Sequence, residues 1–155
     1  GPGDNYHPQN SHVMASLIRK FYEASIKSLP SVMCWGTGSP LREFLHVDDL
    51  GDAVVFALEN WDPSSINAPK DENNNKLTTL NVGTGKDISI KELAFKISNL
   101  LNYKGKIIWD KSKPDGTPKK LLNIQKIQSL GWNPKISLTE GIINTIESYK
   151  FENKI

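Results

Sequence analysis

The residues best suited to bind a charged ligand surround one glycine-rich turn. Trp35 stands before the turn at 36–40 and Arg42 follows it, and the glycines and proline of the turn are typical of a chain reversal. A guanidinium binds phosphate oxygens bidentately, so a cation here, beside an indole, could hold a phosphate below the flat ring. An exposed pair of Arg42 and Glu43 next to a buried tryptophan explains the same spacing, and the spacing alone favours that interpretation.

Patterns that would assign a cofactor or a metal are absent from the sequence. The two Gly-x-Gly pairs, at 36–38 and 83–85, lack the third glycine of the dinucleotide-binding fingerprint, so we interpret them as turns. None of the four tyrosines is followed by a lysine four positions later, which excludes a Tyr-x-x-x-Lys proton donor from residues 1–155. One cysteine and three scattered histidines do not have the spacing of a zinc site, so we expect no metal.

The composition is typical of a single globular domain. Charged residues make up 23% and hydrophobic residues 37% of the 155 positions. A net charge of +2 gives no support for nucleic-acid binding, and no apolar stretch is long enough to cross a membrane. The lone Cys34 excludes an internal disulfide and favours a reducing, cytoplasmic location. Residues 1–5 resemble the middle of a loop, so we expect a piece of a longer protein.

The elements that must position the turn follow from hydrophobic spacing and capping residues. The first half of the chain is predicted to form, in order, a helix from Ser11 to about Lys27, strands at 32–35 and 43–47, a helix from Asp48 or Asp49 to about Asn60, and a polar loop at 61–76. The second half is predicted to form a strand at 78–82, a helix at 89–102, a strand at 106–109, a polar loop at 110–120, and helices at 123–131 and 137–151. The pairs Ser89–Glu92 and Ser137–Glu140 have the spacing of capping boxes. This order predicts a mixed α/β domain.

Five sequence blocks together are far more specific than any single motif. They are Gly-Pro-Gly-Asp-Asn-Tyr-His-Pro-Gln-Asn-Ser-His at 1–12, Trp-Gly-Thr-Gly-Ser-Pro-Leu-Arg-Glu-Phe-Leu-His-Val-Asp-Asp-Leu at 35–50, Asn-Val-Gly-Thr-Gly at 81–85, Ser-Lys-Pro-Asp-Gly-Thr-Pro-Lys-Lys-Leu-Leu at 112–122, and Leu-Gly-Trp-Asn-Pro at 130–134. The blocks closely resemble the C-terminal portion of the GDP-L-fucose synthase family, which consists of extended short-chain dehydrogenases. The resemblance covers nearly the whole chain and weakens only in the loop at 61–77.

The resemblance implies a fold class and a missing partner. It implies a single domain over 1–155, the α/β substrate-binding part of an extended short-chain dehydrogenase that lacks most of the Rossmann sheet. The helix at 48–60 and the strand at 78–82 would normally pack with the missing N-terminal Rossmann domain. NADP(H) is implied for the full-length enzyme, whose cofactor fingerprint would lie upstream, and none is expected on this chain. The family forms homodimers, and neither nucleic acid nor a membrane is implied as a partner.

Five residues match functional positions of the family. His12 matches a histidine that acts in the epimerisation and also lies near the cofactor, and an imidazole suits proton transfer near neutral pH. Lys20 matches a basic substrate contact, Trp35 a contact to the nucleotide through its ring face or indole N–H, and Arg42 the arginine that grips the pyrophosphate. Asp115 matches an acidic contact to ribose hydroxyls or to the N–H edge of guanine.

Each match also has a structural alternative that the residues leave open. His12 could cap the helix that follows Ser11, and Lys20 could be a solvated helix charge. Trp35 could be an ordinary core side chain. Asp115 lies in a Pro-Asp-Gly sequence that is typical of a turn.

The resemblance predicts the substrate-binding part of an enzyme that converts GDP-4-keto-6-deoxy-D-mannose to GDP-L-fucose by 3,5-epimerisation and NADPH-dependent 4-reduction. Because His12 alone of the catalytic groups is present, we expect no turnover from this chain by itself and at best weak binding of GDP-sugars. One alternative is a related sugar-nucleotide epimerase or dehydratase such as GDP-mannose 4,6-dehydratase, against which Asn-Ser-His at 10–12 and Lys-Pro-Asp-Gly-Thr-Pro at 113–118 argue. The other is a non-catalytic module that binds nucleotide sugars.

Overall fold

The computed structural model describes residues 1–152, which form a mixed α/β structure as predicted. The helices are α1 (Val13–Ile26), α2 (Val47–Asn60), α3 (Ile90–Leu100), α4 (Gln125–Ser129) and α5 (Leu138–Glu152). The strands are β1 (Ser31–Trp35), β2 (Leu41–Glu43), β3 (Asp87–Ser89), β4 (Lys106–Asp110) and β5 (Lys119–Lys120). Positions 153–155 of the domain expected over 1–155 lie outside the described residues.

The strands form two small sheets. β1 and β4 are parallel neighbours, with Ser31 opposite Lys106 and Trp35 opposite Asp110. In the second sheet β2 lies in the middle, antiparallel to β3 and parallel to β5. The part of the chain that the structure describes therefore contains no full Rossmann sheet, in agreement with the expected fold class.

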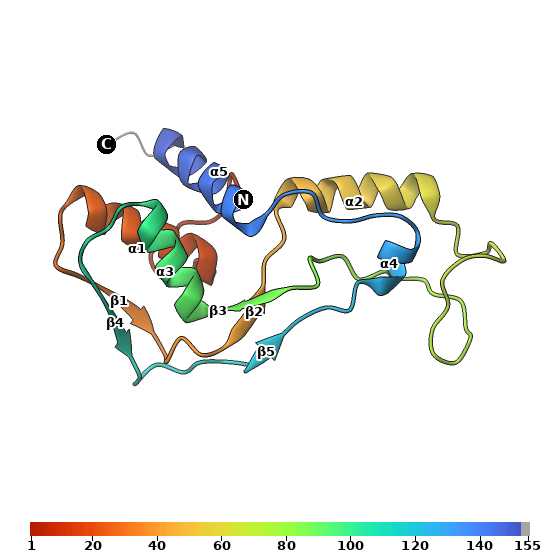
Figure 1. The fold of residues 1–155 in the computed structure, drawn as a ribbon, viewed down its shortest axis with the longest axis horizontal. Helices are drawn as coiled ribbons and strands as arrows, with labels where there is room; N and C mark the ends of the chain where they lie inside the picture. The colour runs from red at the N-terminus through yellow and green to blue at the C-terminus, as the bar shows by residue number, and fades with distance from the viewer. Residues whose placement is uncertain (153–155) are drawn as a thin grey trace.

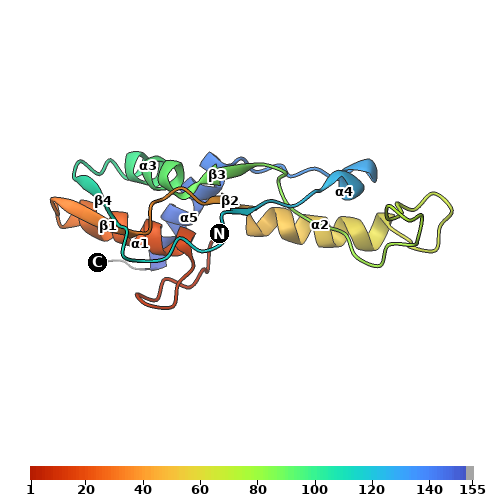
Figure 2. The same ribbon diagram turned by 90° about the horizontal axis from the view of Figure 1, so that it is seen from below.

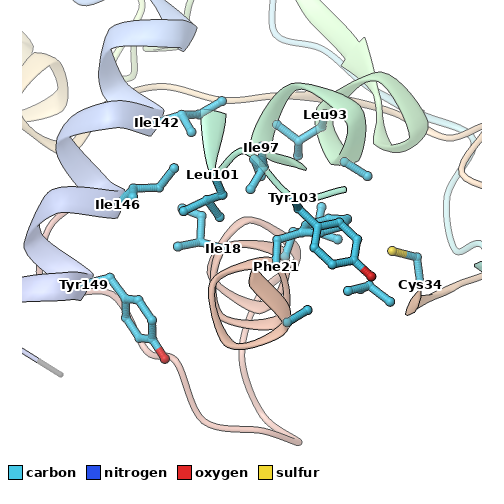
Figure 3. Close-up of a cluster of buried hydrophobic side chains, with 14 residues drawn as sticks. Ile18, Phe21, Cys34, Leu93, Ile97, Leu101, Tyr103, Ile142, Ile146 and Tyr149 are labelled. Carbon is cyan, nitrogen blue, oxygen red and sulfur yellow. The ribbon is translucent and has the colours of Figure 1, made fainter. Parts of the chain in front are cut away.

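The main hydrophobic core lies between α1, α3 and α5 (Figure 3). Its fully buried side chains include Ile18, Phe21, Leu93, Ile97 and Ile142. The pairs on α1 and α3 lie three and four positions apart, and Ile142 and the also buried Ile146 on α5 lie four apart, which places each pair on one face of its helix. The buried Cys34 of β1 belongs to the same cluster, so this core fixes the strand that ends at Trp35.

A second, smaller core lies at the other end of the molecule. It joins α2 to α4 through Ala53, Ile127 and Trp132. The indole N–H of Trp132 also donates to a carboxylate oxygen of Asp52 at 2.9 Å. Figures 1 and 2 show α2 and α4 at one end of an elongated molecule, α1, α3 and α5 at the other, and β2 between them. β2, which carries Arg42, therefore lies between the two cores.

Histidines occupy the N-cap positions of the first two helices, where the spacing predicts Ser11, with His12 as the structural alternative, and Asp48 or Asp49. His12 occupies the N-cap of α1, one residue after the predicted Ser11, and makes no side-chain capping bond. The N-cap of α2 is His46, whose Nδ1 accepts from the N–H of Asp48 at 3.3 Å. The expected cap by Asp48 or Asp49 is wrong, because the imidazole takes that role and the buried Asp49 carboxylate binds another segment of the chain.

The capping boxes were predicted from a purely local pattern. The box of Ser89 and Glu92 at the start of α3 is confirmed, with hydrogen bonds in both directions. At the start of α5 the hydroxyl of Ser137 accepts from the N–H of Glu140 at 3.2 Å, which is half of the second predicted box. Local spacing is therefore enough to locate both helix starts.

Two of the predicted strands lie at β1 and β4, and two others differ from the prediction. The strand expected at 43–47 lies upstream, at β2, because it pairs with β3 and β5 there. The strand expected at 78–82 is wrong: within the described chain no strand lies beside it, and Leu80 and Val82 pack against the second core instead. β3 and β5 were missed because two or three residues are too few to show a periodic pattern.

One side of α2 is apolar and exposed. Val54 and Val55 are about half exposed and Leu58 is 82% exposed, while Val47 and Leu50 are nearly half exposed. Apolar side chains grouped along one helix are typical of a surface that another protein segment covers. In residues 1–152 no helix has the length and apolar character needed to cross a membrane.

Candidate functional site

Three of the predicted site residues line one hollow. Trp35, Arg42 and Asp115 lie around a cavity of about 190 Å³, whose wall Pro40 and Pro114 extend. These residues come from the end of β1, from β2 with the turn before it, and from the loop after β4. The structure thus brings together side chains that are far apart in the sequence.

Lys20 lies in an adjoining hollow of about 220 Å³, which shares Val13, Trp35 and Ile90 with the first. Its Nζ atom is 5.7 Å from the centroid of the Trp35 ring, within the range of cation–π attraction, and donates to the carbonyl of Met33 at 3.1 Å. Burial lowers the pKa of Lys20 below its ordinary value, because a partly buried ammonium loses water. Lys20 is therefore a partly desolvated cation beside the predicted nucleotide contact.

His12 lies in a third hollow, of about 290 Å³, rather than with the other four residues. Val13 belongs to the wall of all three hollows, so the His12 hollow adjoins the other two. In the described part of the molecule the imidazole makes no hydrogen bond. His12 is therefore a neighbour of the site that can contact a ligand extending past Val13, and its predicted role in epimerisation and near the cofactor stays a prediction.

Arg42 is held by the middle strand of the three-stranded sheet. Its backbone is paired with Ile88 of β3 and Lys120 of β5. One guanidinium nitrogen, Nη1, donates to the carbonyl of Leu41 at 2.7 Å. Among residues 1–152, no carboxylate lies within ion-pair distance of this guanidinium. The surface pair with Glu43 that spacing alone favours is thus not formed, and Arg42 retains donors that can bind an anion.

The carboxylate of Asp115 holds the turn at 36–40. Its two oxygens accept from the N–H of Thr37 at 2.6 Å and from the Thr37 hydroxyl at 2.7 Å. These hydrogen bonds, the backbone one first, lower the pKa of Asp115 below its ordinary value. Gly36 is required beside them, since its φ is +77° and a side chain there would collide with the carboxylate. Asp115 therefore has a structural role, and its predicted contact to ribose or guanine stays a prediction.

Glu43 is the residue of the site that the sequence analysis did not identify. Its Oε1 accepts from the N–H groups of Thr84 and Gly85, both at 2.6 Å, and its Oε2 accepts from the N–H of Leu122 at 2.9 Å. The carboxylate thus ties β2, next to Arg42, to two distant segments. In the sequence, the position of Glu43 directly after Arg42 is what could have indicated that it belongs to the site. No local pattern indicates which backbone groups it binds.

The two glycine turns do not fit a dinucleotide cofactor. Phosphate-binding loops offer unpaired backbone N–H groups to the ligand. In the turn at 83–85 two such groups donate to Glu43, and in the turn at 36–38 the N–H of Thr37 donates to Asp115. Protein carboxylates therefore occupy the positions that a cofactor phosphate would need, which agrees with the interpretation of these glycines as turn residues.

Comparisons with known proteins describe a partial but extensive similarity. Residues 1–69 match the model of the NAD dependent epimerase/dehydratase family. The chain is 48% identical over 149 residues to probable GDP-L-fucose synthase 1 of Oryza sativa subsp. japonica, an alignment that covers 96% of this chain and 42% of that protein. It is 44% identical over 155 residues to GDP-L-fucose synthase of Escherichia coli (strain K12), covering 95% of this chain and 44% of that protein. The chain thus spans less than half the length of these relatives.

The fold is similar to that of solved reductases. A GDP-6-OMe-4-keto-L-xylo-heptose reductase from C. jejuni superposes with a TM-score of 0.82 at 33% identity, over 99% of this chain and 51% of that one. A GDP-mannoheptose C4 reductase from Campylobacter jejuni, solved with NADP bound, superposes with a TM-score of 0.78 at 31% identity, over 95% of this chain and 49% of that one. Related structures therefore bind NADP, and the alignment reaches about half of each.

Proposed function

We propose, from its homology to part of the GDP-L-fucose synthases of the NAD dependent epimerase/dehydratase family, that this chain is the substrate-binding portion of such an enzyme. The observation that carries the proposal is the shared hollow of Trp35, Arg42 and Asp115. These residues match the family's substrate contacts and come together from three separate segments. In the whole protein the substrate would be GDP-4-keto-6-deoxy-D-mannose and the product GDP-L-fucose.

The cations of the site support a diphosphate ligand. Arg42 has no carboxylate partner among the described residues, and its fork of donors matches the geometry of phosphate oxygens. Lys20, in the adjoining hollow, adds a second positive charge beside the Trp35 ring. The diphosphate would lie at Arg42 and the nucleoside toward Trp35 and the loop of Asp115.

The sugar end would extend past Val13 toward His12, whose hollow adjoins the others at that residue. An imidazole can give or take the proton on the carbon next to a ketone, which is the step that epimerisation requires. NADPH would supply the hydride for the 4-reduction in the whole protein. The glycine turns of this chain do not fit that cofactor, so its site and the Tyr-x-x-x-Lys pair would lie on another part of the enzyme.

The exposed face of α2 supports an additional domain as a partner. Its apolar side chains, led by Leu58 at 82% exposure, have no covering segment within residues 1–152. Burial of such side chains against a Rossmann domain would remove them from water. This would stabilise the complex by about 25 cal/mol per Å² of apolar area buried. We propose that α2 packs there in the full-length enzyme, which would be a homodimer.

The nucleotide preference can be tested on the 155-residue chain. We expect GDP to bind saturably and UDP to bind about tenfold more weakly, a difference equal to one or two hydrogen bonds to the base. Titrations followed by ¹⁵N–¹H correlation spectra would measure both affinities, and a Trp35→Phe variant identifies the Trp35 indole signal among the four tryptophans. Equal or tighter binding of UDP would contradict the proposed substrate class.

Catalysis by the chain alone is the second test. We expect no oxidation of NADPH above the buffer rate when the chain is mixed with NADPH and GDP-4-keto-6-deoxy-D-mannose, because the groups that hold the cofactor would lie elsewhere. A full-length GDP-L-fucose synthase assayed in parallel serves as the positive control. NADPH oxidation that increases in proportion to the concentration of this chain would overturn the proposed division of roles.

A second candidate function is the reduction of a different GDP-linked keto sugar. The TM-score of 0.82 and 33% identity to a GDP-keto-heptose reductase favour it specifically. It shares the GDP moiety and the ketone with the first candidate, so nucleotide binding does not separate the two. Comparison of GDP-4-keto-6-deoxy-D-mannose with a GDP-keto-heptose as ligands, read at the His12 imidazole, would separate them.

A further inference from the structure

We propose that Lys113, held over the Trp35 ring, is a third cationic contact for the diphosphate and acts together with Lys20 and Arg42. The proposal rests on the proposed function, since it assigns a further ligand-binding residue to that same site. It also changes the role of Trp35, which becomes a support for two ammonium groups as well as a contact to the nucleotide.

Two lysine ammonium groups lie close to the ring of Trp35. Nζ of Lys113 lies 5.5 Å from the centroid of the Trp35 ring, and Nζ of Lys20 lies 5.7 Å from the same centroid. The negative electrostatic potential of an indole face attracts cations at this distance, and tryptophan does so best among the aromatic residues. Trp35 is 62% exposed, so both ammonium groups gather at a solvent-accessible ring rather than inside the core.

The three cations around the ring form no ion pair at contact distance within the described residues, and the Asp110 carboxylate interacts electrostatically with Lys113. In residues 1–152 the ion pairs involve neither Lys113, Lys20 nor Arg42. Asp115, the carboxylate of the same hollow, is bound to Thr37. Like charges gathered at one place repel one another, and a dianionic ligand between them would remove that repulsion.

The loop that carries Lys113 is anchored on both sides of it. Upstream, the backbone N–H of Lys113 donates to the carbonyl of Asp110 at 3.2 Å, and the Ser112 N–H and hydroxyl donate to the Asp110 carboxylate at 3.0 and 2.6 Å. Downstream, Asp115 is bound to Thr37, which joins the loop after β4 to the turn before β2 (Figure 1). The backbone of Lys113 is thus positioned before a ligand arrives, which lowers the entropic cost of binding.

The two ammonium groups also bear on how a base could contact Trp35. A guanine stacked on either face of the ring would have to displace any ammonium group that lies over that face. A diphosphate beside the ring would instead form charge-assisted bonds to both. The geometry therefore favours a phosphate near the ring and a nucleoside contact through its edge or indole N–H.

The test uses three probes and three variants of the 155-residue chain. The probes are inorganic pyrophosphate, GDP and guanosine, and the variants are Lys113→Ala, Lys113→Arg and Lys111→Ala. Lys111 is the matched control, since it is an exposed lysine of the same loop and makes no contact with the Trp35 ring. We expect Lys113→Ala to weaken GDP and pyrophosphate about three- to tenfold, with guanosine unchanged, and Lys113→Arg to retain most of the affinity.

The outcomes test the Lys113 assignment and the proposed function separately. If wild-type chain binds GDP and Lys113→Ala binds GDP and pyrophosphate as tightly, the assignment of Lys113 is wrong and the proposed function stands. If wild-type chain binds pyrophosphate but shows no preference for GDP over UDP, the nucleotide assignment fails while the Lys113 variants still decide the diphosphate contact. Failure of wild-type chain to bind pyrophosphate, or an equal loss in Lys111→Ala, overturns the inference. Melting temperatures within error of wild type ensure that the variants are folded.

Discussion

Replacement of Asp49 by alanine is expected to lower the free energy of unfolding by about 3 kcal/mol, and the melting temperature by roughly 6–12 °C. Asp49 is 2% exposed, and its two carboxylate oxygens accept from the N–H groups of Lys135 and Ile136, both at 3.0 Å. These bonds join the start of α2 to the segment that leads into α5. Alanine would leave two backbone donors without their acceptor and a void where the buried carboxylate lay.

Asp48 provides the matched control for this prediction. It precedes Asp49 in the same first turn, its side chain is 75% exposed, and its carboxylate lies 3.5 Å from Nδ1 of His46. Asp48→Ala is expected to change the free energy of unfolding by less than about 1 kcal/mol, because the Asp48 carboxylate is largely exposed to water and its removal leaves no buried backbone donor of the described chain without an acceptor. Urea denaturation followed by circular dichroism measures both variants. Equal effects at the two positions would show that Asp49 does not hold the segments together.

The contrast between α3 and α2 explains which helix starts could be predicted. At α3 the capping residues Ser89 and Glu92 are three positions apart, so all the information needed lies in one turn. At α2 two adjacent aspartates are equally good caps by local preference. The structure uses His46 as the cap, and the Asp49 carboxylate instead accepts from the N–H groups of Ile136 and of Lys135, the latter 86 positions away. A single sequence contains no signal for that contact.

The same limit applies to the strands. β1 and β4 were predicted because each has five residues with an apolar pattern. The stretch at 78–82, Thr-Thr-Leu-Asn-Val, contains three β-branched residues that favour a strand, but hydrogen bonds between strands require a partner at the right place, and the described chain offers none. β3 and β5 form only because β2 lies between them. Whether these segments form strands therefore depends on a pairing partner and not on the local preference of their residues.

For the site, the sequence indicated which side chains could bind a phosphate, but it did not indicate which side chains come into contact in the fold. The guanidinium of Arg42 and the indole of Trp35 suggested a phosphate site from residue type alone, and family resemblance added Lys20, Asp115 and His12. The common hollow of Trp35, Arg42 and Asp115 depends on three segments folding together, which no spacing rule predicts. Glu43 was missed for that reason, since its acceptor role appears only once the turn at 83–85 lies beside β2.

Arg42→Ala is expected to weaken binding of GDP to this chain by about 10- to 100-fold, the largest functional effect of any single replacement at the site. Charge-assisted hydrogen bonds of a guanidinium to phosphate oxygens contribute about 1.5–3 kcal/mol, and each 1.4 kcal/mol corresponds to a factor of ten in affinity. Titration with GDP, followed by ¹⁵N–¹H correlation spectra or calorimetry, measures the loss. The fold should be unaffected, because the side chain bonds only to the carbonyl of Leu41 in the described structure.

Two controls separate geometry from charge in this prediction. Arg42→Lys keeps the positive charge but loses the planar fork of donors, so its affinity should lie between those of wild type and Arg42→Ala. Lys86→Ala removes one positive charge from an exposed position outside the three hollows and should leave GDP affinity nearly unchanged. If Arg42→Ala and Lys86→Ala weaken binding equally, the effect comes from net charge, and Arg42 does not grip the diphosphate. If Arg42→Lys binds as tightly as wild type, a point charge suffices and the bidentate contact is wrong.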